Sequence, residues 1–372
     1  MFVPHLQEQI LVLIALSVGV VFLARLTRSI TPKRGAITMP IRVMHFGLGP
    51  IGVGILRQIA TRKGFKAVGG IDIDPAKVGK DLGEIAGLDR KLGVKVSDDP
   101  VAAIKKVKPD VVVLCTLSSL QAVMPQIETV LKLRVPIVST TEELAYPYAS
   151  NKRLAKKIDE LARKAKVAVV GTGVNPGFVM DALPIMLTGV CERVDSIRID
   201  RIQDARSRRL PFQKKIGSGL TVEEFQNKVA AGTVRHVGLT ESIAMIADAF
   251  GWRMDKITDS IQPKLAEHQV ASQFLTVEPG FVCGLIQDGV GYGKEGKALI
   301  TLHMEAYLGA PESYDAVTIE GHPNLCSRVQ GGFHGDVATA SIAVNTIPKI
   351  LTAPPGLRTM RDMALPSYYG GR

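Results

Sequence analysis

The sequence predicts an α/β protein that combines a doubly wound parallel sheet with a second, α+β domain built on an open, mainly antiparallel sheet. Up to residue 178, short apolar runs alternate with helical patterns, which is typical of a parallel sheet covered by helices. A glycine motif joins the first apolar run to the first helical pattern. After residue 190 the pattern changes, and several alternating runs between residues 257 and 319 indicate antiparallel strands.

The first strand, helix and second strand lie between residues 41 and 74. The apolar run 41–46 leads into a G-x-G-x-x-G turn, and a second run, 67–73, ends beside an aspartate. The glycines permit a sharp turn, the close approach of a pyrophosphate and tight helix packing, and the helix N-terminus attracts the phosphates. The aspartate is placed to accept hydrogen bonds from a ribose. The segment therefore predicts a Rossmann-type dinucleotide site formed by Gly47, Gly49, Pro50, Ile51, Gly52 and Asp72.

The cofactor is expected to be NAD or NADP, with a mild preference for NAD. No arginine follows Asp72 directly, but Lys77 and Lys80 could still meet a 2′-phosphate. Three further residues are assigned to cofactor binding: Thr116, Ser118 and Asn175.

The rest of the first domain continues the alternation. Helices are expected at residues 75–85, after Asp98-Asp99-Pro100, at 118–131 and at 151–165, and strands at 94–96, 111–114, 136–138 and 167–171. Ligands of such sheets bind beyond the carboxyl ends of the strands. Three loops are therefore expected to converge on one site: 47–52, 139–146 and 172–178.

Two adjacent carboxylates, Glu142 and Glu143, follow a central strand. A carboxylate there could hold an ammonium group or move a proton at a carbinolamine. The alternative is a helix-entry acid, because Thr140 or Thr141 could cap a short turn.

The second domain begins with a strand at 196–202 and a polar stretch at 203–215, followed by helices near 222–231 and 239–250. A glycine turn at 331–336 then enters an apolar helix, 337–350, that is expected to return to the first domain. The predicted boundaries are 39–178 for dinucleotide binding, 179–325 for substrate binding and dimerisation, and 326–372 for the returning segment. One face of the open sheet is expected to be free for a substrate or another subunit.

Substrate-binding residues are expected near these loops. The basic stretch 206–215 could clamp a substrate carboxylate, or it could be a solvated loop. His334 stands in the returning glycine turn, where a structural histidine is the alternative. The full set assigned to substrate binding is Glu143, Val174, Phe178, Arg206, Lys215 and His334.

Composition excludes several classes of protein. The chain has 372 residues and a formal net charge of +11, but no recognisable nucleic-acid module, so an anionic cofactor and an acidic substrate explain the charge better. The four cysteines show no disulfide spacing, which favours thiols in a reducing cytoplasm. No histidine or cysteine cluster has metal-ligand spacing, so no metal is predicted.

Residues 1–38 form a hydrophobic extension. Residues 10–24 carry no charge and are followed by Arg25, Arg28, Lys33 and Arg34. Because a membrane-spanning helix needs about 20 apolar residues, this run is borderline. A misassigned start is favoured, since Met39-Pro40 stands directly before the first strand. The alternative is an anchor at residues 10–24 that would tether the protein to the membrane with its enzyme domain in the cytoplasm.

From Ile41 onward the chain resembles the 2,4-diaminopentanoate dehydrogenases and native amine dehydrogenases, within the superfamily that has a dihydrodipicolinate reductase-like N-terminal domain. The matching stretches are IRVMHFGLGPIG, IDIDPAKVGKDLGE, STTEELAYP, GTGVNPGFVMDALP, KKIGSGLT and GGFHGDVATASIAVNTIPKIL. The resemblance implies reversible, NAD(P)-dependent oxidative deamination of an amine, with 2,4-diaminopentanoate or a related amine as the leading substrate. It also implies that Glu142 is the catalytic acid/base and that homodimers form through the open sheet.

Two alternatives stay open. The first is an imine or enamine reductase of the dihydrodipicolinate reductase type. That enzyme carries a histidine pair where this chain has Arg201-Ile202, which argues against the activity. The second is a membrane-tethered nucleotide-binding protein without turnover, which needs residues 1–38 to be genuine and Glu142 to be idle.

Overall fold

The parallel sheet that the alternation predicts is present, with its strands in the order β15-β6-β5-β4-β1-β2-β3. A computed structural model describes residues 39–371 of the chain, so the hydrophobic extension lies outside the described residues. All pairs in this sheet are parallel. The strands are β1 (Ile41–Phe46), β2 (Phe65–Ile71), β3 (Val96–Ser97), β4 (Val111–Leu114), β5 (Ile137–Ser139), β6 (Ala168–Gly171) and β15 (Gly356–Arg358).

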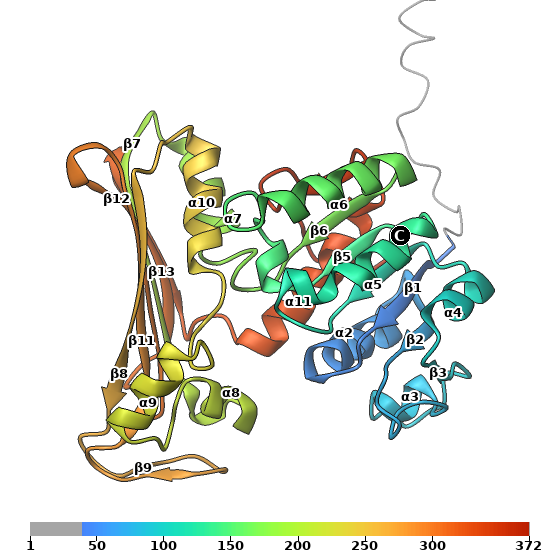
Figure 1. Ribbon diagram of the computed structural model, residues 1–372, viewed down its shortest axis with the longest axis horizontal. Helices are drawn as coiled ribbons and strands as arrows, with labels where there is room; N and C mark the ends of the chain where they lie inside the picture. The colour runs from blue at the N-terminus through green and yellow to red at the C-terminus, as the bar shows by residue number, and fades with distance from the viewer. Residues whose placement is uncertain (1–38, 372) are drawn as a thin grey trace, which may run out of the picture. The chain divides into compact units, whose positions relative to one another are not determined.

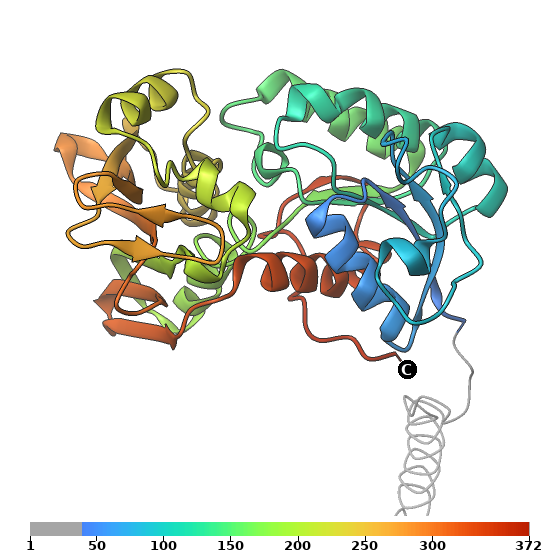
Figure 2. The same ribbon diagram turned by 90° about the horizontal axis from the view of Figure 1, so that it is seen from below.

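Helices cover both faces of the parallel sheet (Figure 2). The helices α2 (Pro50–Thr61) and α11 (Gly335–Ile350) share one apolar core, and α5 (Leu120–Lys132) and α6 (Lys152–Ala165) share the other. The order of the strands reverses between β1 and β4, so their carboxyl ends open a crevice of the kind that binds ligands in doubly wound folds. The apolar C-terminal helix does return to the first sheet, as predicted, because α11 packs against α2.

The structure corrects the expected helix at residues 75–85. Only Leu82–Ile85 is helical, as α3. Asp74 instead closes a turn, accepting backbone N–H groups of Lys77 and Val78 through its carbonyl oxygen. The side chain of Asp81 then caps α3 and also binds the backbone of Leu92 and Val94, which starts the helix late. The expected strand at 94–96 begins at Val96, and β15 was not expected.

The second sheet has six strands in the order β14-β13-β7-β12-β11-β8 (Figure 1). Only the β7–β12 pair is parallel, so the prediction of a mainly antiparallel sheet is confirmed. The strands are β7 (Arg193–Asp204), β8 (Lys256–Leu265), β11 (Val282–Tyr292), β12 (Ala298–Tyr307), β13 (Tyr314–His322) and β14 (Leu325–Gln330). A separate two-stranded sheet pairs β9 (Val270–Ala271) with β10 (Thr276–Val277).

The two faces of this second sheet differ. Along β12, Ile300, Leu302, Met304 and Ala306 are buried on the face that packs against α10 (Leu239–Phe250) and the neighbouring helix α9 (Val222–Ala230). The alternate residues Thr301, His303, Glu305 and Tyr307 are only partly buried. Within residues 39–371, no helix is drawn across that second face (Figure 1).

Part of the basic stretch 206–215 is helical rather than a loop. The helix α8 (Leu210–Lys215) begins with a proline in its first turn, where a missing N–H costs nothing. Gln213 is buried and donates to the carbonyl oxygens of Ala205 and Arg208, which ties the helix to the preceding turn. The remaining helices are α4 (Pro100–Val107) and α7 (Ala182–Leu187). None of the helices in residues 39–371 has the length and apolar character of a membrane span.

Candidate active site

The glycine loop after β1 has the shape that a dinucleotide needs. A Cβ added at Gly47 would lie 2.4 Å from the carbonyl oxygen of Cys115, and one at Gly52 would lie 2.1 Å from that of Gly47. Gly47 also has a φ of +94°, which favours glycine. A Cβ at Gly49 would meet no atom within 4 Å, so the loop leaves open space at the start of α2. These residues fit a pyrophosphate held by backbone N–H groups.

Asp72 lies at the end of β2, where the sequence predicts a ribose contact. Its carboxylate accepts hydrogen bonds from the backbone of Leu48 at 2.8 Å and of Asp74 at 2.9 Å. Lys77 Nζ lies 3.3 Å from Asp72 and 3.3 Å from Asp74. Burial works to raise the pKa of Asp72, but these hydrogen bonds and Lys77 outweigh it and leave the pKa lowered. A fixed carboxylate therefore stands beside the glycine loop, with a lysine close to it.

Glu142 opens a short 3-10 helix (Glu142–Leu144) after β5. The loop that carries it is pinned to the neighbouring strand end, because Ser139 Oγ donates to Leu114 O and Thr141 Oγ1 donates to Leu117 O. Thr141 precedes this helix without capping it through its side chain, and Glu142 and Glu143 both stand in its first turn. In the described part of the chain, the Glu142 carboxylate forms no hydrogen bond or ion pair.

A cavity of about 430 Å³ joins the three predicted loops. Its lining includes several residues that the sequence singles out, which are Gly49, Pro50, Ile51, Thr116, Ser118, Glu142, Val174, Asn175 and Lys215. The loop at 172–178 is held by the returning helix, since Val174 N donates to Thr339 Oγ1 at 3.2 Å. The expectation that these loops converge is thus met within one cavity.

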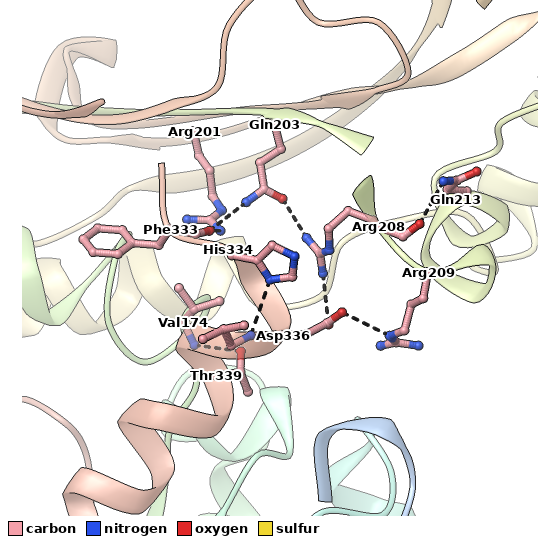
Figure 3. A network of polar contacts seen from close by, with 11 residues as sticks. Val174, Arg201, Gln203, Arg208, Arg209, Gln213, Phe333, His334, Asp336 and Thr339 are labelled. Carbon is pink, nitrogen blue, oxygen red and sulfur yellow. Dashed lines mark hydrogen bonds and ion pairs between the residues drawn. The ribbon is translucent and has the colours of Figure 1, made fainter. Parts of the chain in front are cut away.

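The other side of the cavity is rich in positive charge. Four residues that line it, which we call the basic wall, are Arg201, Arg208, Arg209 and Lys215. Figure 3 shows the three arginines. Arg208 is held over the ring of Phe212, with its guanidinium carbon 4.0 Å from the ring centroid. It donates to Gln203 Oε1 at 3.1 Å and to Asp336 Oδ1 at 3.1 Å. Arg209 lies 3.5 Å from the same Asp336.

Arg201 plays a supporting part in this wall. It is almost fully buried in β7, where Nη1 donates to Asp315 at 2.7 Å and Nη2 donates to Phe333 O at 3.0 Å. Asp315 also accepts the backbone N–H of Phe333 at 2.7 Å. This buried pair fixes the glycine turn that leads into α11 and so positions Asp336 beneath Arg208.

Several buried nitrogens of the cavity have unused hydrogen-bonding capacity. Among residues 39–371, no hydrogen-bond partner is found for Arg208 Nε or His236 Nδ1, whereas Arg209 Nε forms the ion pair with Asp336 at 3.5 Å. Lys215 forms no ion pair with any described residue. Because buried polar groups are normally paired, donors left over in one cavity favour an anionic ligand group there.

The structure places four predicted substrate residues outside the cavity lining. Arg206 pairs with Asp204 at 2.6 Å on the surface. Glu143 accepts from the backbone N–H of Leu120 at 2.8 Å, so it caps α5. Phe178 packs edge-on against Phe333, with 5.7 Å between ring centroids. His334 is exposed and caps α11 by accepting from Val337 N. Its geometry is therefore that of a structural histidine, the alternative to a substrate-binding role.

Sequence reasoning assigned no site role to several polar residues of the lining, among them Arg201, Gln203, His236 and Asp336. They come from β7, from the segment before α10 and from the start of α11. No local motif marks them, because they meet only when these elements are assembled.

Covalent and metal chemistry find no support in the lining. Cys115 lines the cavity, but burial raises the pKa of its thiol to about 12, so it is not a thiolate nucleophile at neutral pH. Within residues 39–371, no group of three or more histidine, cysteine or acidic side chains is placed to hold a metal ion.

Comparison with known proteins gives a consistent result for both halves of the chain. Residues 178–371 match the 2,4-diaminopentanoate dehydrogenase C-terminal domain, and residues 41–172 match the N-terminus of dihydrodipicolinate reductase. A 2,4-diaminopentanoate dehydrogenase from Acetoanaerobium sticklandii is 33% identical, over 88% of this chain and 94% of that protein.

Two amine dehydrogenases are also similar. One from Streptomyces virginiae is 23% identical over 87% of this chain and 96% of its own length. The solved structure of an amine dehydrogenase from Mycobacterium smegmatis is 26% identical, with a TM-score of 0.79, and covers 89% of this chain and 98% of that one.

Proposed function

This chain belongs to the 2,4-diaminopentanoate dehydrogenase family, and from that premise we propose that it oxidatively deaminates an amine that also carries a carboxylate. The leading candidate substrate is 2,4-diaminopentanoate. The proposed reaction takes a protonated amine, NAD(P)+ and water to a carbonyl compound, ammonium, NAD(P)H and a proton, and it is reversible.

One observation carries the proposal about the substrate. The cavity places a carboxylate without a partner among the described residues, that of Glu142, in the same space as a basic wall with unused donors. A carboxylate attracts the ammonium end of a substrate, and arginine and lysine attract its carboxylate end. A simple alkyl amine would leave the donors of the basic wall unpaired, which costs binding free energy.

Glu142 is proposed to manage the protons of the reaction. The nicotinamide supplies the hydride acceptor. Glu142 takes a proton from the substrate ammonium, so that the nitrogen lone pair can stabilise the carbon that loses hydride. Once that first proton has passed to solvent, Glu142 takes a proton from the water that adds to the resulting iminium carbon and returns it to the nitrogen. The nitrogen then leaves as ammonia while the carbinolamine hydroxyl loses its proton to form the carbonyl, and the ammonia takes up that proton as ammonium. The basic wall keeps the opposite end of the substrate in place throughout.

A preference for NAD over NADP is part of the proposal. The Asp72 carboxylate beside the glycine loop would repel a 2′-phosphate. Lys77, which lies close to both Asp72 and Asp74, weakens that repulsion, so the proposed preference is modest.

We also propose a homodimer that forms through the second face of the six-stranded sheet. That face carries partly buried side chains such as His303, Glu305 and Tyr307 and no covering helix within the described residues. The test compares the mass in solution of the wild type with that of a variant whose charge on this face is reversed, such as Arg198→Glu. The wild type is expected to have the mass of a dimer, and the variant is expected to dissociate. An unchanged dimer mass would contradict the assignment of the face.

Three substrates that differ by one group at a time test the proposed activity. The full-length chain is mixed with NAD+ or NADP+ and with 2,4-diaminopentanoate, 4-aminopentanoate or 2-aminopentane, and absorbance is followed at 340 nm. Both acids are expected to be turned over with a higher catalytic efficiency than the simple amine. A higher efficiency for the simple amine would contradict the carboxylate proposal. Turnover of none of the three, but of dihydrodipicolinate with the reduced cofactor, would favour the reductase alternative.

A further inference from the structure

His236 lies in the cavity lining on the segment just before α10. Its backbone is held from both directions by one buried side chain, because His236 N donates to Gln287 Oε1 at 2.8 Å and Gln287 Nε2 donates to His236 O at 3.0 Å. Gln287 is anchored in turn on Asp259 at 2.9 Å. The position of the imidazole is therefore set by the second sheet.

The imidazole itself has an unused hydrogen-bonding atom. Nδ1 is buried and has no partner among residues 39–371. Burial, and then the positive charges of Lys215, Arg201, Arg208 and Arg235, lower the pKa of His236 to about 3. The ring is therefore neutral at physiological pH, so one of its nitrogens accepts a hydrogen bond and the other donates.

Among the described residues, two lining side chains have a buried neutral atom that is free to accept, Nδ1 of His236 and Oδ1 of Asn175, and Asn175 is the one assigned to the cofactor. The acceptor groups of Gln203 and Asp336 already serve Arg208, and Asp336 also pairs with Arg209. Glu142 is assigned to the reacting amine. His236 and Lys215 line the same cavity as the three arginines, where a substrate carboxylate would bind.

A diamino acid needs such an acceptor. One of its amino groups reacts, and the other remains an ammonium that loses its hydration when the substrate enters the cavity. Arginine and lysine cannot accept from an ammonium, and their charges repel it. A neutral imidazole accepts from it without adding another positive charge.

We propose that His236 determines specificity by accepting a hydrogen bond from the non-reacting ammonium group of a diamino acid, beside the carboxylate held by Lys215 and the arginines. This inference rests on the proposed function and refines it. According to this inference, His236 and the basic wall together recognise the end of the substrate that carries both a carboxylate and an ammonium group, rather than a carboxylate alone.

Two substrates that differ only in the second amino group test this role. Catalytic efficiency is measured with 2,4-diaminopentanoate and with 4-aminopentanoate, for the full-length wild type and for His236→Phe, and the first value is divided by the second. The ratio is expected to fall about tenfold or more in the variant, because the ammonium loses its acceptor. His236→Gln, which retains an acceptor, is expected to recover part of the ratio. The matched control His268→Phe changes an exposed histidine that is not in the cavity lining.

The outcomes separate this inference from the proposed function. An unchanged ratio in His236→Phe, with the wild type active on the diamino acid, would overturn the inference alone. An equal loss on both acids would show that the ring binds the carboxylate, and would overturn it as well. If His236→Phe does not fold, as shown by its thermal midpoint, the ratio in His236→Ala decides, because alanine also lacks the acceptor and adds no volume. Wild-type protein that turns over neither acid would overturn the proposed function, and this inference with it.

Discussion

The glycine loop at residues 47–52 and the basic wall line the same cavity, but they are built in different ways. The loop is contiguous in sequence and works through backbone, since a Cβ at Gly47 or Gly52 would collide with a carbonyl oxygen. The basic wall is assembled from β7, α8 and their connection and is held by partners on β13 and α11, and it works through charged side chains. One region depends on local conformation, and the other depends on the packing of the second sheet against the returning helix.

This difference indicates where substitutions should act. A change in the glycine loop alters the space available to a cofactor whatever the substrate is. A change in the basic wall, or in the residues that hold it, alters which substrate is accepted while the cofactor site stays intact. Substitutions can test that separation, beginning with Glu142, which lines the same cavity as both regions.

Glu142→Gln is expected to have the largest effect. The variant keeps the size of the side chain but cannot take a proton, so kcat is expected to fall about 10²-fold to 10⁴-fold, with cofactor binding retained. Steady-state rates and cofactor titration measure the two effects. Glu143→Gln is the matched control, because that carboxylate caps α5 and is not in the lining. Similar rates for Glu142→Gln and wild type would remove Glu142 from the chemistry.

Gly335→Ala tests the basic wall without removing a charge. A Cβ there would lie 2.6 Å from both terminal nitrogens of Arg208, so the guanidinium must move away from Asp336. The KM for a carboxylate-bearing substrate is expected to rise about tenfold, while the affinity for the cofactor changes little. Gly189→Ala is the control, since a Cβ at that position would meet no atom within 4 Å. An equal loss of cofactor affinity would mean that the two regions are not separable.

Asp72→Ser tests the glycine-loop side. The change removes a negative charge and leaves Asp74 as the ion-pair partner of Lys77 among residues 39–371. The ratio of catalytic efficiencies with NADP+ and with NAD+ is expected to rise about fivefold, which corresponds to about 1 kcal/mol, the interaction of two unit charges about 4 Å apart in water. The preference between 2,4-diaminopentanoate and 4-aminopentanoate is expected to stay the same. A change in that preference would contradict the separation of the two regions.

Two buried, neutral histidines outside these two regions, His45 and His236, are expected to act differently. His45 in β1 is 1% exposed, neither of its ring nitrogens has a partner in the described chain, and burial lowers its pKa to about 3. Its pKa in the unfolded chain is near 6.5. The free energy of unfolding should therefore be unaffected above that pH and should fall by about 1.4 kcal/mol per pH unit below it, until the pH reaches about 3.

His45→Leu is expected to reduce this acid sensitivity without changing substrate preference. Thermal or urea unfolding at pH 7 and at pH 5 measures the difference between variant and wild type. The readout is the pH dependence, because the leucine also changes packing in the core. Identical pH dependence in the two proteins would contradict the assignment of this acid sensitivity to His45. The change His236→Phe, in contrast, is expected to alter substrate specificity.

Local sequence predicted most of the first half of the fold. Alternating apolar runs placed β1, β4, β5 and β6 within a residue or two, and the returning helix was expected from the glycine turn before it. The failures have local causes that hydrophobic periodicity does not contain. Asp74 and Asp81 bind backbone groups and delay α3, and β15 is a strand only because β6 offers it an edge.

By itself, the sequence determined the glycine loop, the position of Glu142 after a central strand and the change of pattern near residue 190. These features depend on backbone conformation and on spacing along the chain, which neighbouring residues control. Only the tertiary structure decided that Arg208 and Arg209 line the cavity while Arg206 pairs with Asp204 outside it. The tertiary structure likewise placed His236 and Asp336 in the cavity lining, although no sequence motif links them to it. The physical reason is that the direction of a side chain depends on partners distant in sequence, here Gln203, Phe212 and Asp336 around Arg208.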